Sequence, residues 1–332
     1  MTAKKSVLIV AQDDGGRLDP VVFDTVTAAK RLTGGAQGGV AAVLTGPPGT
    51  QALAEELWAT GVADVYVAEH AALAEPRADS HARAVAVAVR QARPSLVLVG
   101  QTLLGRDLAP YLAARMDAGV IMNATELRLD ASGATEVVCP IYGGGVQAVY
   151  RVSESPPSVV GFQRTVKSTA ERVSHSRGRV IPVDPGLGGF KDKVKLVERS
   201  ARSGPRLEEA NVVVSGGMGL GEAKNYRYIE ELAEVLGGLP GASRAICDLG
   251  WAARARQVGL TGTRVFPNLY MAVGIAGASQ HLAGMSTSKV IVAVNTDTKA
   301  PIFKYARYGV TLDCVEFLPA FIAECRKLKS HS

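Results

Sequence analysis

The feature that most constrains the fold is an alternation of short apolar runs with helical segments through the first half of the chain. Four runs rich in β-branched and aliphatic residues read as strands: Ser6–Ala11, Val40–Leu44, Asp64–Ala68 and Ser95–Gly100. The segments between and after them have helical spacing: Pro20–Leu32, Gln51–Thr60, His81–Ala92 and Gly105–Met116. Because strands joined by crossover helices pair in parallel, this rhythm predicts a parallel α/β sheet.

The rhythm changes after residue 124. Four strand-like runs follow without helices between them, which predicts antiparallel strands that extend the sheet: Ala124–Leu129, Thr135–Cys139, Val146–Val152 and Ser158–Phe162. The charged segment Lys191–Arg206 contains Ser-Gly-Pro and is typical of a linker. We therefore expect an N-terminal α/β domain at residues 1–199 and a second domain at 200–332.

Alternation resumes in the second half of the 332-residue chain. One helix is expected at Tyr226–Leu236. The expected strands are Asn211–Ser215, Arg244–Cys247, Leu269–Val273, Val290–Val294 and Thr311–Cys314. The sequence therefore predicts a two-domain α/β protein, with added antiparallel strands in the first domain.

Charge and composition disfavour several classes of protein. The net charge is +6, but Lys and Arg are dispersed, so a nucleic-acid partner is not expected. The four cysteines form no CxxC pair and predict reduced thiols and no metal site. No apolar run approaches the roughly 18 residues of a membrane span, and no signal peptide is recognisable, so we expect a cytoplasmic location. Hydrolase and metalloprotease motifs are absent, and no catalytic residue is assigned.

Small and polar residues follow the expected strands of the second half. Such residues at the carboxyl ends of parallel strands let a ligand approach the backbone. The turn Gly216–Gly221 is either a phosphate site or a plain strand–helix turn. Arg244 could bind an anion or form a surface ion pair, and His281 could be functional or structural. Asp297 is expected to be a turn residue.

Taken together, these motifs resemble the α subunit of electron transfer flavoproteins. The matching segments occur in the family's order: SGG-x-GL, GASRA, VG-x-TG, LY-x-A-x-GI-x-GA-x-QHLAGM, SK-x-IVA-x-N-x-D and API-F-x-x-A-x-YG. The first half adds GRDLAP, LAAR, ATEL and YGGG. The resemblance covers nearly the whole chain and is strongest over residues 210–313. It implies a C-terminal Rossmann-like domain that binds FAD.

The resemblance also implies roles for individual residues. Arg244 would lie against the flavin ring and favour its anionic reduced forms, Thr261 would offer a hydroxyl to the reactive edge, and His281 would reach the pyrimidine side. The backbone of Gly277–Gln280 would hold phosphate or ribitol, and Asn295 and Asp313 would bind the adenosine end. The full set of implied cofactor-binding residues is Met218, Ser243, Arg244, Val258, Gly259, Leu260, Thr261, Ala276, Gly277, Ala278, Ser279, Gln280, His281, Asn295, Asp313 and Cys314.

Three residues depart from the family pattern. Met218 stands where Arg is common, Leu260 where Gln is usual, and Ala276 where Ser is usual. Each change removes a polar group expected near the FAD. These departures predict a divergent member with an altered hold on its cofactor.

The resulting expectation is an electron carrier without substrate chemistry of its own. By the family resemblance it would pair with a β subunit, which could hold AMP or a second FAD. It would accept electrons from flavin dehydrogenases, such as the acyl-CoA dehydrogenases of fatty acid β-oxidation, and pass them to a quinone oxidoreductase or another acceptor. Two alternatives stay open: a flavin- or NAD-dependent oxidoreductase with its own substrate, and an adenine-nucleotide-binding module built on the first domain.

Overall fold

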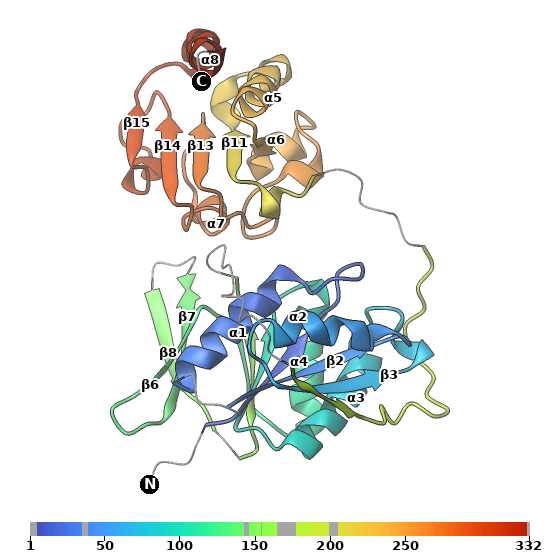
Figure 1. Ribbon diagram of the computed structural model, residues 1–332. Helices are drawn as coiled ribbons and strands as arrows, with labels where there is room; N and C mark the ends of the chain where they lie inside the picture. Colours follow the sequence, from blue (N-terminus) through green and yellow to red (C-terminus); the bar gives the residue numbers. More distant parts are fainter. Residues whose placement is uncertain are drawn as a thin grey trace. The chain divides into compact units, whose positions relative to one another are not determined.

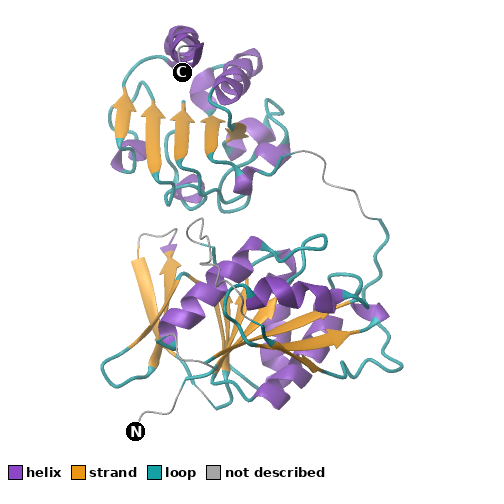
Figure 2. Ribbon diagram, in the orientation of Figure 1, coloured by secondary structure: helices purple, strands orange, loops and turns teal. Residues whose placement is uncertain are grey.

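The chain folds into two compact units, each with its own sheet and core. The computed structural model describes residues 5–34, 39–142, 146–153, 155–164, 177–198 and 205–330. Apart from residues 142–144, the first unit ends at residue 200 and the second begins at 201. Figures 1 and 2 show helices flanking the sheet of each unit. The predicted two-domain α/β class is confirmed.

A seven-stranded sheet organises the first unit, in the order β10-β3-β2-β1-β4-β9-β5. Its paired strands all run parallel. The strands are β1 (Val7–Ala11), β2 (Val40–Gly46), β3 (Asp64–Glu69), β4 (Leu96–Gly100), β5 (Val120–Ala124), β9 (Ser158–Phe162) and β10 (Arg179–Pro182). The helices are α1 (Pro20–Leu32), α2 (Ala54–Trp58), α3 (Ala78–Ala92) and α4 (Leu103–Met116).

Helices on both faces explain why the strands are apolar without alternation. In β1, Ile9 packs in a core with Val22 of α1. Its neighbour Leu8 packs in a second core with Val85 of α3 and Leu108 of α4. Successive strand side chains point to opposite faces, so a strand that is covered twice needs apolar residues throughout.

The antiparallel strands form a separate sheet in the order β6-β7-β8. They are β6 (Glu126–Leu129), β7 (Thr135–Ile141) and β8 (Val146–Arg151). The prediction that Ser158–Phe162 joins them is wrong, because this strand, β9, lies parallel to β4 inside the main sheet. All five of its residues are buried, which suits an interior strand of a covered sheet. Strands β5 and β10 had no counterpart in the sequence prediction.

The second unit contains a five-stranded parallel sheet in the order β12-β11-β13-β14-β15. Its strands are β11 (Val212–Gly216), β12 (Leu239–Ala242), β13 (Leu269–Val273), β14 (Val290–Val294) and β15 (Tyr308–Val310). Its helices are α5 (Tyr226–Val235), α6 (Arg244–Asp248), α7 (Ser279–Leu282) and α8 (Cys314–Ser330). This doubly wound arrangement bears out the Rossmann-like prediction, and it places a topological switch point between β11 and β13.

Two strand predictions in this unit are wrong. Residues 244–247 form helix α6, and the ion pair between Arg244 and Asp248 joins its two ends one helical turn apart. Residues 311–314 follow β15 and lead into α8, where the Asp313 carboxylate accepts the backbone N–H of Val315 at 2.7 Å. Short polar side chains favour such helix starts over strands.

Two further findings bear on function. None of the helices described is both long enough and apolar enough to cross a membrane. Within the described residues, His, Cys, Asp and Glu side chains nowhere gather in a group of three that could hold a metal. All four cysteines are free thiols, as predicted.

Candidate functional site

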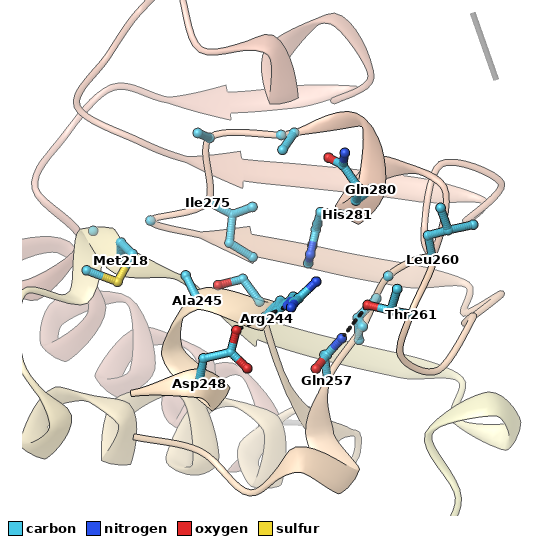
Figure 3. A pocket seen from close by; sticks show the side chains of 18 of the residues that line it. Met218, Arg244, Ala245, Asp248, Gln257, Leu260, Thr261, Ile275, Gln280 and His281 are labelled. Carbon is cyan, nitrogen blue, oxygen red and sulfur yellow. Dashed lines mark hydrogen bonds and ion pairs between the residues drawn. The ribbon is translucent and has the colours of Figure 1, made fainter. Parts of the chain in front are cut away.

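A cavity of about 690 Å³ lies at the carboxyl edge of the second sheet. The segments that line it follow β11, β12, β13 and β14, with the loop at residues 257–261 completing the wall. Open parallel sheets bind ligands at this edge, next to the switch point. The volume falls within the roughly 300–1,000 Å³ of small-molecule sites. Met218 and Leu260 lie at opposite ends of the cavity in Figure 3, with Arg244 and His281 between them.

The glycine turn after β11 is anchored to the end of β13. The backbone N–H groups of Gly217 and Gly219 donate to Val273 O and Gly274 O, both at 2.9 Å. A Cβ at Gly217 would sit 2.4 Å from Gly274 O, so only glycine permits this approach. Because these two amides already donate hydrogen bonds within the protein, they favour the tight-turn interpretation over a phosphate site. The Met218 side chain is 49% exposed and lines the cavity.

Ser243 and Arg244 follow β12 directly. The Ser243 N–H donates to Gly216 O at 2.9 Å and ties the ends of β12 and β11 together. The Arg244 guanidinium contacts the cavity, and its Nε lies 3.1 Å from Asp248 Oδ2. Asp248 also pairs with Arg254, at 3.3 Å. One carboxylate thus serves two guanidinium groups, which leaves net positive charge at the cavity wall.

A tight loop carries Thr261. The N–H of Val258 donates to Ala242 O at 2.9 Å, and the N–H of Leu260 donates to Gln280 O at 2.7 Å. These bonds hold the loop against β12 and α7. The Thr261 side chain accepts a hydrogen bond from Gln257 Nε2 at 3.0 Å, drawn as a dashed line in Figure 3. Its hydroxyl is therefore held at the cavity wall.

His281 is a buried, neutral imidazole at the start of α7. Its Nε2 lies 2.8 Å from the hydroxyl of the fully buried Tyr270. Burial lowers the pKa of His281 from 6.5 to about 4, although the Val258 backbone opposes the shift. Its Nδ1 is buried and makes no hydrogen bond of standard geometry within the described structure, although the Val258 backbone lies close enough to oppose the pKa shift. The ring is therefore only partly satisfied by the protein.

Asn295 stands at the end of β14. Its amide donates to Ile275 O at 3.0 Å, and its side-chain oxygen accepts the N–H of Asp297 at 2.9 Å. It links the ends of β13 and β14 while lining the cavity. Asp297 accepts the N–H of Lys299 at 2.9 Å, which confirms it as a turn residue.

The structure brings most of the implied cofactor-binding residues to this cavity. They are Met218, Ser243, Arg244, Val258, Gly259, Leu260, Thr261, Ala276, Gly277, Ala278, Gln280, His281 and Asn295. Three others do not line it. The Ser279 hydroxyl bonds to Gln280 Oε1, and Asp313 caps α8. Cys314 Sγ donates to Gly219 O at 3.1 Å, and burial raises the pKa of this thiol to about 11.

Three lining residues, Ala245, Asp248 and Gln257, were not considered as ligand-binding residues in the sequence analysis. Gly219, Gly274 and Ile275 lie in the ligand-type turns of the motifs but were not among the implied cofactor-binding residues. The spacing of Arg244 and Asp248 signals a helical ion pair, but a strand had been predicted there. Gln257 directly precedes the Val-Gly-x-Thr-Gly motif, and only its burial distinguishes it from other glutamines.

Comparison with known proteins identifies the family. Residues 7–185 match the family described as "Electron transfer flavoprotein domain", and residues 206–286 match "Electron transfer flavoprotein FAD-binding domain". The chain is 37% identical to the electron transfer flavoprotein subunit alpha of Thermoanaerobacterium thermosaccharolyticum over 99% of this chain and 100% of that one. It is 37% identical to the subunit alpha of Bacillus subtilis over 99% of both chains.

A third relative carries a different name. The protein FixB of Azorhizobium caulinodans is 33% identical, over 99% of this chain and 91% of that one. These matches extend across both units, and the second family match covers most of the segments that build the cavity. The chain belongs to the electron transfer flavoprotein α-subunit family.

Proposed function

We propose that this chain is the FAD-binding subunit of a heterodimeric electron transfer flavoprotein. The observation that carries the proposal is the cavity at the β11–β13 switch point, which Arg244 and Thr261 line together with Gln257, whose buried amide oxygen has no partner in the described structure. Buried polar atoms are nearly always paired in native proteins, so an unpaired one at a cavity supports a missing ligand. The match to an FAD-binding family supports FAD as that ligand.

The residues present fit a flavin. The oxidised ring carries several hydrogen-bond acceptors, and reduction adds negative charge. Thr261 provides a hydroxyl, and Arg244 provides a cation that cannot lose its proton under physiological conditions. By the family resemblance, Asn295, which lines the same cavity, would bind the adenosine end. Bound FAD would supply one- and two-electron transfer; the protein's part is to orient it and to set the surrounding charge.

The described cavity contains no group poised for acid–base work near pH 7. His281 is neutral there because burial lowers its pKa to about 4. Asp248 is committed to two arginines. This arrangement supports a carrier better than an enzyme with its own substrate.

The partners follow from the proposed role. The second subunit would be an electron transfer flavoprotein β subunit, able to hold AMP or a second FAD, with the first unit of this chain as its scaffold. Donors would be flavin dehydrogenases such as the acyl-CoA dehydrogenases, and the acceptor a quinone oxidoreductase or a similar protein. We place the complex in the cytoplasm.

A single preparation tests the proposal. The chain is co-expressed with a β subunit, purified, and its visible spectrum is recorded before and after addition of a reduced flavin dehydrogenase. We expect a yellow complex whose flavin bands bleach. A colourless complex, or one whose flavin stays oxidised with every donor tried, contradicts the proposal. A coloured protein that oxidises a small substrate unaided favours the enzyme alternative.

A further inference from the structure

Gln257 is a buried amide of which only one of the two polar atoms has a hydrogen-bond partner in the part of the chain that the structure describes. Its side chain lines the cavity wall, and the residue is only 2% exposed. Nε2 donates to Thr261 Oγ1 at 3.0 Å, while Oε1 is buried without a partner in the described structure. An unpaired buried polar atom costs stability that an apolar side chain of the same length would not. Its presence therefore needs a reason other than folding.

The orientation of the amide decides what Thr261 can do. With Nε2 facing Thr261, the amide oxygen is left without a partner, whereas the reverse orientation would leave the whole NH₂ group without one. The Thr261 oxygen therefore accepts from Gln257, and one of its lone pairs is occupied. Among the residues described, none accepts the Thr261 hydroxyl proton. Thr261 itself is exposed at the cavity, so this proton is free to point at a ligand.

We propose that Gln257 is a positioning residue that presents the Thr261 hydroxyl as a hydrogen-bond donor to the ligand. This inference rests on the proposed function, in which that ligand is FAD. An oxidised flavin offers acceptors at its reactive edge, and a donor held in place complements them.

A double-mutant cycle tests whether Gln257 acts through Thr261. The variants are Gln257→Met, Thr261→Val and the double variant, each in the full-length chain purified with its β subunit. We expect FAD binding to weaken about 2- to 10-fold in Gln257→Met, the loss of one oriented neutral hydrogen bond. In the Thr261→Val background, Gln257→Met should add nothing.

Gln12 provides the matched control. It is also a buried glutamine, 6% exposed, but both ends of its amide are paired: Nε2 donates to Gly100 O at 2.8 Å, and Oε1 accepts from Thr102. Gln12→Met should lower the melting temperature and leave the FAD affinity unchanged. Gln257→Met should leave the melting temperature of the FAD-free protein unchanged or higher.

A second variant covers the case in which Gln257→Met does not fold. Gln257→Glu keeps the shape, but an ionised carboxylate can only accept, so it draws the Thr261 proton away from the cavity. FAD binding should weaken at high pH and recover as the carboxyl group becomes protonated and can donate again.

The outcomes separate this inference from the function on which it rests. An unaltered protein that binds no FAD overturns the proposed function. An unaltered protein that binds FAD, with additive effects in the double variant or with FAD binding in Gln257→Glu equal to wild type at every pH, overturns the role of Gln257 alone.

Discussion

The two parallel sheets of this chain present the same kind of edge, but they treat polar groups there differently. At the ends of β1 and β4, the Gln12 amide bonds to Gly100 and Thr102 and is fully paired. At the carboxyl edge of the second sheet, Gln257 lies beside the end of β12 and keeps a buried amide oxygen without a partner among the described residues at the cavity. Both edges flank a topological switch point, where either sheet could bind a ligand. The unpaired amide oxygen beside the cavity therefore supports our proposal that the second edge binds the ligand.

Two buried histidines repeat the contrast. His81 in the first unit uses both ring nitrogens: Nδ1 lies 2.7 Å from Thr45 Oγ1, and Nε2 lies 3.1 Å from Glu75 O. Within the described residues, His281 makes one hydrogen bond of standard geometry, through Nε2, and its Nδ1 makes none. Burial lowers the pKa of both rings. Both nitrogens of His81 are satisfied within the protein.

The largest effect is expected from adding a side chain at Gly219, where the backbone packs against Gly274 beside the cavity. A Cβ at Gly219 would lie 2.6 Å from Gly274 Cα, a backbone atom that cannot rotate away. Gly219→Ala should cost about 3 kcal/mol of stability in the second unit and abolish FAD binding. Thermal unfolding and FAD titration measure both effects. Gly188→Ala is the control, since nothing lies within 4 Å of its Cβ position. Equal losses in both variants would mean that the close contact between Gly219 and Gly274 is not the cause.

The next effect separates two arginines that share one carboxylate. Arg244 lines the cavity and Arg254 does not, yet both pair with Asp248. Arg244→Met should weaken FAD binding about 10- to 100-fold, the range for a hydrogen bond to a charged group. Arg254→Met should change it less than about 3-fold, as expected for an exposed ion pair. Equal effects measured by flavin titration would mean that only the net charge of the wall matters.

A pH experiment distinguishes the histidines. The pKa of His281 is about 4 in the folded protein and near 6.5 when unfolded, so the unfolded state binds the proton first. Stability contributed by the neutral ring is complete above about pH 6.5 and is lost as the pH falls toward 4, by about 2 kcal/mol at pH 5. His281→Gln should remove this loss from the second unit.

The readout can be confined to one unit at a time. The chain has two tryptophans, Trp58 in the first unit and Trp251 in the second. Urea unfolding of FAD-free protein, followed by Trp251 fluorescence in a Trp58→Phe background, reports on His281. The loss on acidification should persist for the second unit in His81→Gln. If His81→Gln abolished it instead, the assignment to His281 would be wrong.

The smallest effect concerns a departure from the family pattern. Met218 is half exposed at one end of the cavity, so a longer cationic side chain has room there. Met218→Arg should tighten FAD binding about 2- to 5-fold, the gain of a solvent-screened charge contact. Leu249→Arg adds the same charge at an exposed position outside the cavity lining and should have no effect. No gain in Met218→Arg would mean that the departure from the family pattern at this position does not weaken FAD binding.

Much of the fold could be predicted because periodicity reports burial directly. The β1 and β13 runs are apolar on both faces, and helices cover both faces of their sheets. The predictions failed where a segment was short. Residues 244–247 carry too little periodicity to separate one helical turn from a strand, and Ser158–Phe162 does not reveal its partner. Strand pairing is a long-range choice that a local pattern does not encode.

The sequence by itself determined that two parallel sheets form and that small and polar residues gather at the carboxyl edge of the second. Only the tertiary structure decided which side chains enter the cavity. Asp313 and Ser279 were implied to bind the cofactor, as Thr261 was. In the structure, however, Asp313 caps a helix and Ser279 bonds to its neighbour. Gln257 lies outside the motif and reaches the wall because the loop folds back on β12. Side-chain direction depends on backbone torsions and on neighbours distant in sequence, and spacing does not record these.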